Sequence, residues 1–352
     1  MRDFTYRSQN AHVLFGQGSI GRLEEAVSMV GGKRALLLST PQQADQPRAL
    51  TEGLGCIVDM FDGATMHTPV DVTERALEAV ETAQADCLVA FGGGSTIGLA
   101  KAIALRTDLP QIAIPTTYAG SEMTPILGQT ENGRKTTLKS PKVLPELVIY
   151  DVDLTLGLPA AMSGTSGINA IAHAVEGLYA QDTNPVMRMI AAAGIEALAD
   201  ALPTIARKPD DIEARSQALY GAWLCGTVLG SVGMALHHKL CHTLGGSFNL
   251  PHAETHTIVL PHAIAYNAPA VPEAMDILRH ALQSDDPAQA LYDLGRAVNA
   301  PASLRDIGMP EDGIDVAADQ AVENAYWNPR PLDRNELRDL IARAWAGEAP
   351  RT

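Results

Sequence analysis

The sequence has little of what marks several protein classes. Only four of its 352 residues are cysteines, and they fit no CxxC spacing. A disulfide framework or a cysteine-rich metal site is therefore not expected, and buried thiols in a reducing compartment are favoured. Lysine and arginine number 26 against 41 acidic residues, which gives a net charge of −15. Nucleic-acid binding needs a basic face, so no nucleic-acid partner is expected.

Targeting and membrane segments are also lacking. The first seven residues carry charge but no apolar core follows them, so they do not read as a signal peptide. No uninterrupted apolar run approaches the ~20 residues of a membrane span. We therefore expect a cytoplasmic protein without a membrane partner.

What the sequence does contain, up to about residue 155, is short apolar runs alternating with helical stretches. The runs at 34–39, 56–59, 86–91, 111–114 and 147–150 read as buried parallel strands. From Pro159 onward strands largely vanish and alanine-rich helix formers dominate. We predict an α/β domain over residues 1–158, with a Rossmann-like parallel sheet, and an all-α domain over residues 159–352.

Two loops in the first half suit a nucleotide. Gly92-Gly93-Gly94-Ser95 follows one strand, and Ser95 is a good helix N-cap whose first-turn amides could bind a pyrophosphate. Thr116 and Thr117 follow the next strand, at the edge where open α/β sheets bind ligands. A tight glycine turn without a ligand and a merely capped helix are the alternatives.

Histidines are concentrated in the second half, with six of the ten between residues 237 and 262. His238 and His242 are four residues apart and project from one helix face, and His252 follows a Gly-Gly break. Asn169 and His173 form another such pair. These imidazoles suit either a metal or proton transfer with oxyanion stabilisation. A metal site would place an acid where the chain has Asn169.

These segments together resemble the iron-containing alcohol dehydrogenase superfamily, which is related in fold to dehydroquinate synthase. The glycine turn, the Pro115-Thr-Thr loop, the Asn169-to-Glu176 stretch and the histidine pattern occur in the family's order and spacing. The resemblance covers nearly the whole chain and implies a dehydroquinate synthase-like fold and a homodimer. Ser39–Gln43, 250–262 and Tyr326–Pro331 are similar to one branch of the family.

That branch reduces the C=C bond of a small dicarboxylate, maleylacetate, to 3-oxoadipate in aromatic-compound catabolism. The resemblance implies NADH or NADPH as cofactor, and Ser39-Thr40 at the end of the first strand excludes neither, so we expect NADH with NADPH tolerated. The resemblance also implies His242 and His252 as the principal catalytic pair beside His173 and His238. His237, His256 and His262 are expected to be hydrogen-bonded core histidines. The cofactor residues that it implies are Ser39, Gly93, Gly94, Ser95, Thr116, Thr117, Tyr118 and Lys135. The cations available for the substrate carboxylates are Lys139, Lys142, Lys239 and Arg330.

Two departures from the metal-dependent pattern bear on the chemistry. Asn169 stands where the iron enzymes carry Asp, while His173, His238 and His252 match their histidine ligands, and Gly98 replaces a second Asp. Loss of the anionic ligand weakens a site for a divalent cation, so no metal is expected. Three histidines with Asn169 could still hold zinc, as in a metal-dependent alcohol dehydrogenase. A dehydroquinate synthase-like lyase is the other alternative.

Overall fold

The computed structural model forms two compact units, Ser8–Leu158 and a second one that contains Pro159–Thr352. It describes the chain except residues 1–3, 5, 7, 9, 10, 132, 324 and 352, and the side chain of Lys135. The expected boundary lay at this same turn, although most of residues 1–7 of the expected first domain lie outside the described residues.

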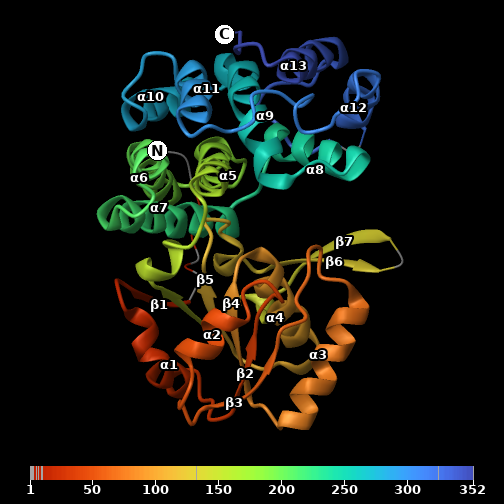
Figure 1. The fold of residues 1–352 in the computed structure, drawn as a ribbon. Coiled ribbons are helices and arrows are strands. Elements are labelled where there is room, and N and C mark those ends of the chain that lie inside the picture. Colours follow the sequence, from red (N-terminus) through yellow and green to blue (C-terminus); the bar gives the residue numbers. More distant parts are fainter. Residues whose placement is uncertain are drawn as a thin grey trace. The chain divides into compact units, whose positions relative to one another are not determined.

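The first unit is built on a six-stranded parallel sheet with the order β1-β8-β5-β4-β2-β3. Figure 1 shows it with its helices. Its strands are β1 (His12–Phe15), β2 (Ala35–Leu38), β3 (Ile57–Phe61), β4 (Cys87–Gly92), β5 (Gln111–Pro115) and β8 (Leu147–Tyr150). Its helices are α1 (Leu23–Met29), α2 (Asp45–Leu50), α3 (Val70–Ala83) and α4 (Gly94–Thr107). The predicted parallel sheet is confirmed.

Alternate residues of the strands face opposite sides of the sheet, which explains their continuous apolar runs. Leu37, Val89, Ile112 and Ile149 pack on one face with α1. On the other face α3 and α4 contact the strands. A strand covered on both faces needs apolar residues at every position, as the sequence shows.

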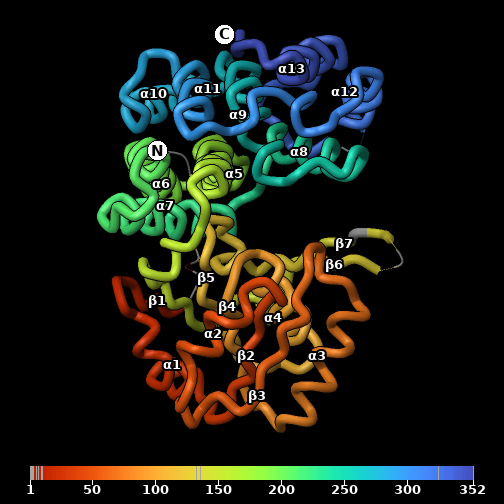
Figure 2. Tube along the Cα trace, in the orientation of Figure 1, coloured from red at the N-terminus to blue at the C-terminus, as the bar shows by residue number. Residues whose placement is uncertain are grey.

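The strand order places a topological switch point between β2 and β4. The chain leaves β2 toward β3 at one edge, whereas it leaves β4 toward β5 and β8 on the other side. Ligands of open α/β sheets bind outside the carboxyl ends of the strands at such a point. The loops after β2 and β4, traced in Figure 2, are therefore the expected nucleotide loops.

One element of this unit was not predicted. β6 (Ile126–Glu131) and β7 (Arg134–Lys139) form an antiparallel hairpin apart from the main sheet. Its residues are mostly polar, and β6 is largely half-buried while β7 is largely exposed, so the hairpin lacks the apolar run that indicates a buried strand. Leu127 packs with Ala102 of α4 and with Val143, which ties the hairpin to the helix.

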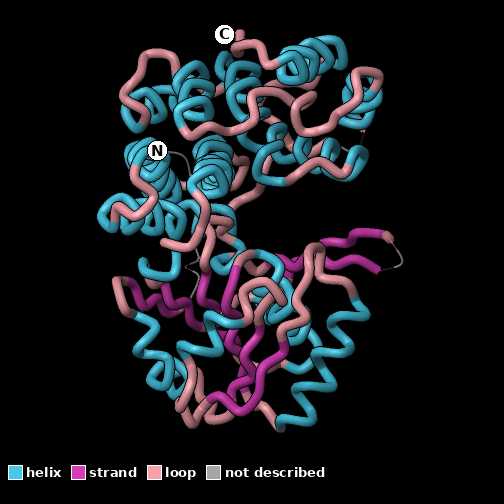
Figure 3. The backbone as a smooth tube through the Cα atoms, viewed as in Figure 1, coloured by secondary structure: helices cyan, strands magenta, loops and turns pink. Residues whose placement is uncertain are grey.

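The second unit is helical throughout its described part, as Figure 3 shows. Its helices are α5 (Ala160–Tyr179), α6 (Pro185–Arg207), α7 (Ile212–Ser231), α8 (Leu236–Phe248), α9 (His252–Asn267), α10 (Pro272–Ala281), α11 (Pro287–Ala297), α12 (Gly313–Val322) and α13 (Arg334–Ala346). Helices α8, α9, α12 and α13 share one apolar core. By length and composition α6 could cross a membrane, and so could α7 and α8 together if that bent pair were one span. α6 packs against α5 and α7.

Candidate active site

The glycine turn after β4 is shaped by its backbone. Gly92 has φ +148°, and a Cβ there would lie 2.6 Å from Thr96 Oγ1. A Cβ on Gly93 would lie 3.0 Å from Thr117 Cγ2, whereas one on Gly94 would meet nothing within 4 Å. Gly92 is thus required by its backbone conformation, and Gly93 by its close approach to the Thr117 side chain unless that side chain shifts, while the space beside Gly94 is open to a ligand.

Helix α4 begins two residues earlier than expected. Its N-cap is Gly93, and no side chain caps the first turn, so the prediction that Ser95 is the N-cap is wrong. Gly94 enters the helix directly because no Cβ hinders it. The first-turn amides of a helix have no intrahelical acceptor, and here no side chain takes that place. This arrangement suits a phosphate better than the predicted cap does.

Gln43, which follows β2, joins the two loops of the switch point. Its Nε2 donates to Thr116 Oγ1 at 3.2 Å, and its Oε1 would lie 3.1 Å from a Cβ on Gly92. The amide of Thr116 donates to Gly92 O at 3.2 Å. Gln43 therefore ties the β2 loop to the threonine loop, and the Thr116 amide ties the threonine loop to the glycine turn.

The remaining predicted cofactor residues differ in accessibility. Ser39 is fully buried and its hydroxyl donates to Thr40 O, so the half-buried Thr40 presents the hydroxyl at this strand end. Tyr118 is buried and Thr117 is half-buried. The side chain of Lys135 lies outside the described residues.

In the helical unit, three helices bring the predicted histidines together. Asn169 and His173 come from α5, His238 and His242 from α8, and His252 is the first residue of α9. Ring centroids of His173 and His238 are 5.1 Å apart, and those of His238 and His242 are 6.1 Å apart.

The two predicted principal residues are the accessible ones. His242 and His252 are exposed, whereas His173 and His238 are buried. Buried atoms without a hydrogen-bond partner include Asn169 Oδ1, His173 Nδ1 and His238 Nε2. Such atoms favour a bound water or ligand among them, because unpaired buried polar atoms are costly.

Glu176 organises this cluster, a role that the sequence did not reveal. Its fully buried carboxylate accepts hydrogen bonds from the amides of Ala235 (2.8 Å) and His237 (2.7 Å) at the start of α8. Its Oε2 lies 2.7 Å from His238 Nδ1. An anion at a helix N-terminus is favourable. The contact also orients His238 with Nε2 directed away from the carboxylate.

His237 and His256 are buried and hydrogen-bonded, as expected for core histidines, yet they also belong to the cluster. His237 Nε2 and His256 Nδ1 are 3.0 Å apart, which ties α8 to α9. The His256 ring lies 4.3 Å from that of His252 and 5.0 Å from that of His238. Burial lowers the pKa of His173, His237 and His256 well below the ordinary value, so these rings stay neutral at pH 7.

Among the donors that match the iron ligands, Asn169 is the one that fits a divalent cation poorly, because a neutral amide stands in place of a carboxylate. Within the described chain, one group of three histidine, cysteine or acidic side chains has its ligand atoms within 4.8 Å of one another, namely His237, Cys241 and His256. His173, His238 and His252 do not form such a group, and Asn169 adds no charge. The His237 and His256 nitrogens bond each other, and burial raises the pKa of the Cys241 thiol well above its ordinary value. A neutral thiol is a poor metal ligand.

The candidate cations for the substrate carboxylates are not equivalent. Arg330 donates to Tyr266 O and Glu336 and stacks on the Tyr266 ring, so it serves the fold. Lys142 pairs with Asp108. Lys239, half-buried on α8 beside His238, is the candidate nearest the cluster in sequence.

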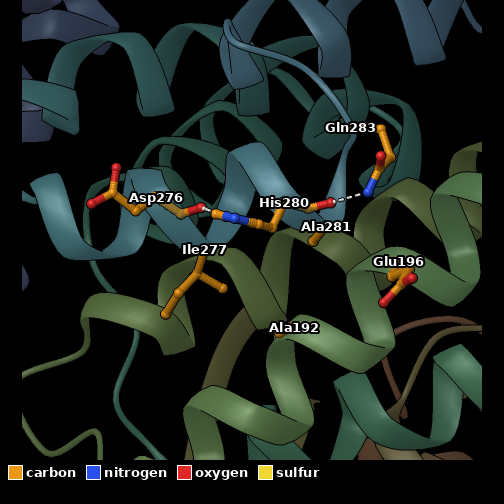
Figure 4. A pocket seen from close by; sticks show the side chains of 7 residues that line it. All are labelled: Ala192, Glu196, Asp276, Ile277, His280, Ala281 and Gln283. Atoms are coloured by element: carbon orange, nitrogen blue, oxygen red, sulfur yellow. Dashed lines mark hydrogen bonds between the residues drawn. The ribbon is translucent and has the colours of Figure 1, made fainter.

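A groove of about 420 Å³ between α6 and α10 contains none of the predicted residues. His280 Nδ1 lies 2.7 Å from Asp276 O, and Gln283 Nε2 donates to His280 O, as Figure 4 shows. These polar groups are bonded within their own segment, so the groove does not offer the convergent groups of an active site.

Comparison with known proteins identifies the family of the chain. Residues 10–152 match the model of the iron-containing alcohol dehydrogenases, and residues 163–345 match the C-terminal model of the Fe-containing alcohol dehydrogenase family. A maleylacetate reductase from Rhizobium sp. (strain MTP-10005) is 55% identical over 99% of this chain and 100% of its own.

Solved structures extend the likeness. The crystal structure of maleylacetate reductase from Agrobacterium tumefaciens has a TM-score of 0.97 at 54% identity, covering 99% of this chain and 100% of that one. Sulfoacetaldehyde reductase from Bifidobacterium kashiwanohense, solved with NAD+, has a TM-score of 0.89 at 21% identity over 98% and 99% of the two chains, which shows the fold alone. The chain is an oxidoreductase that belongs to the iron-containing alcohol dehydrogenase family, in its maleylacetate reductase branch.

Proposed function

We propose that the enzyme reduces the C=C bond of maleylacetate to 3-oxoadipate in aromatic-compound catabolism, with NADH preferred, NADPH tolerated and no divalent metal required. The observation that carries the substrate is the 55% identity, over nearly the whole of both chains, with a relative named for this reaction. The observation that favours metal independence is the neutral amide of Asn169, which stands beside His173 and His238 where a carboxylate would be needed.

The chemistry of the substrate explains how imidazoles could replace a Lewis acid. Reduced nicotinamide, when bound, supplies a hydride, and addition at the carbon β to the ketone leaves negative charge on the ketone oxygen as an enolate. Conjugation spreads this charge, unlike that of a simple aldehyde. One well-aimed hydrogen-bond donor is worth ~2.7–4 kcal/mol in such a transition state. His242 and His252, the exposed members of the cluster, are the residues that we assign to enolate stabilisation and protonation.

The buried members of the cluster would hold the exposed pair. Glu176 fixes α8 and His238, and the His237–His256 hydrogen bond ties α8 to α9. The groups that meet substrate therefore stand on helices whose first turns are locked by buried hydrogen bonds.

The test is the loss of nicotinamide absorbance with maleylacetate and with simple aldehydes, each before and after dialysis against a chelator. We expect turnover of maleylacetate at a rate that dialysis leaves unchanged. Activity lost on dialysis and regained in step with about one iron or zinc per chain would contradict the metal-free proposal. Preference for the aldehydes would favour a metal-dependent alcohol dehydrogenase.

We also propose that the enzyme acts as a homodimer in the cytoplasm. The four free cysteines support a reducing compartment. The dimer rests on the family resemblance alone. Sedimentation equilibrium measures the assembly directly, and a monomer at micromolar concentration would argue against the dimer.

A further inference from the structure

We infer that Tyr326 is a positioning residue for His242: its hydroxyl binds Nδ1 of the imidazole and so orients the ring for proton transfer through Nε2. The Tyr326 hydroxyl lies 3.0 Å from His242 Nδ1, and the two rings meet edge-to-face at a centroid distance of 6.1 Å. The inference rests on the proposed function because that function assigns proton transfer to His242. The contact between Tyr326 and His242 is independent of the function.

Tyr326 lies outside the helices, yet the segment that carries it is firmly anchored. Two residues later, Asn328 exchanges two amide hydrogen bonds with the buried Asn267 of α9, at 2.9 and 2.8 Å. Asn328 Oδ1 also accepts from the amide of Leu236, the first residue of α8, at 3.4 Å. The segment is thus bonded to the helix that bears His242.

A second anchor follows. The Arg330 guanidinium lies 4.2 Å from the centre of the Tyr266 ring and donates to Tyr266 O at 2.8 Å. The Tyr266 hydroxyl donates to Pro331 O at 2.6 Å. Cation–π contact and hydrogen bonds at both ends of one tyrosine hold this segment against α9. A side chain on such a segment can fix a catalytic ring, which a mobile loop could not do.

The position of the hydroxyl determines which nitrogen reacts. Burial raises the pKa of Tyr326, so its hydroxyl stays protonated and its oxygen can accept from Nδ1–H of a protonated His242. Nε2–H then points away from Tyr326. When this proton moves to the enolate carbon, the N–H bond breaks, its electron pair remains on Nε2 and a C–H bond forms. The ring is left neutral with its proton on Nδ1, and water returns a proton to Nε2.

A double-mutant cycle tests whether Tyr326 acts through His242. Tyr326→Phe keeps the ring and removes only the hydroxyl, and we expect kcat for maleylacetate to fall about tenfold, as for loss of a hydrogen bond to a charged group. The KM for NADH should not change. In the His242→Ala background the same substitution should cost nothing further. Tyr220→Phe on α7 makes the same chemical change where the ring lies against Trp223, and it should leave kcat unchanged.

Two results would overturn the inference: a Tyr326→Phe variant with the wild-type kcat, or an equal loss with and without His242. If the wild type fails to reduce maleylacetate, the proposed function falls, but the positioning role is still measurable. Nitrogen NMR of the His242 ring reports which nitrogen carries the proton. A tautomer population that is the same in wild type and Tyr326→Phe would then refute the role.

Discussion

The two units prepare their candidate sites in opposite ways. In the sheet unit, the nucleotide loops depend on glycines and hydroxyls placed by strand order, with the space beside Gly94 left open. In the helical unit, the site is a set of ionisable side chains whose inner members are buried and kept neutral. Shape and backbone amides carry the first site, whereas burial and hydrogen bonds carry the second. The two units should therefore respond differently to acid and to substitution.

Acid should reveal the largest difference. Burial lowers the pKa of His262 from 6.5 to about 4, and it lowers those of His173, His237 and His256 well below 6.5. Below 6.5 the unfolded chain binds these protons while the folded chain does not, so stability is full above that pH and is lost as pH falls toward the folded values. Each histidine removes about 1.4 kcal/mol per pH unit within its window.

Fluorescence can follow this loss in one unit alone, because all three tryptophans (Trp223, Trp327 and Trp345) belong to the helical unit. We expect the melting temperature read by tryptophan to fall steeply below pH 6.5. In His262→Asn one histidine fewer takes up a proton on unfolding, so the melting temperature should fall less steeply with pH. His280→Asn, at an exposed site, should leave that slope unchanged. A melting temperature independent of pH down to 4 would show that the cluster is not held neutral.

Substitution of the exposed histidines should abolish most catalysis and spare the other unit. We expect kcat to fall by ~10²-fold or more in His242→Ala and in His252→Ala, the range for acid–base or oxyanion groups. NADH affinity, measured by fluorescence titration, should barely change because the cofactor loops belong to the sheet unit. His280→Ala is the control. A parallel loss of NADH affinity would mean that the two sites are not separable in this way.

The glycine turn should show the reverse pattern. Gly94→Val places a branched side chain in open space, so folding should persist while the KM for NADH rises about tenfold, as for the loss of one or two hydrogen bonds to pyrophosphate. Gly55→Val, before the amino end of β3, also meets nothing within 4 Å and serves as the matched control. Gly92→Val should fail to fold because of its φ of +148°. An unchanged KM for NADH in Gly94→Val would mean that the glycine turn does not bind the cofactor.

The sequence could predict what depends on local pattern. Buried strands have continuous apolar runs, and β8 was predicted to the residue at Leu147–Tyr150. The hairpin β6–β7 was missed because its mostly polar strands carry no such run. The grouping of His173, His238, His242 and His252 followed from helical spacing and from the family resemblance.

Partners from distant segments could not be predicted in the same way. Glu176 stands seven residues after Asn169, so its place on that face of α5 could have been read from the spacing. The hydrogen bonds by which Glu176 caps α8 could not be read in this way, because they join residues about sixty positions apart. Nor did any sequence pattern indicate that Gln43 reaches Thr116, or that Tyr326 reaches His242. Such contacts are set by packing.

The smallest expected effect concerns how the buried pair, His237 and His256, supports the exposed pair, His242 and His252. His256 offers two nitrogens: Nδ1 bonds His237, whereas Nε2 is buried without a hydrogen-bond partner. Asn at this position places its amide near the place of Nδ1 and could keep the bond to α8, whereas Gln reaches toward the place of Nε2 and would lose it. If the tie between α8 and α9 is what holds His252, His256→Asn should keep kcat within about twofold, and His256→Gln should lose about fivefold, the worth of one hydrogen bond near 1 kcal/mol. The KM for NADH should stay constant in both. If His256→Gln were active and His256→Asn inactive, Nε2 of His256 would be the nitrogen that catalysis needs. His256 would then be a group that contacts the reacting atoms.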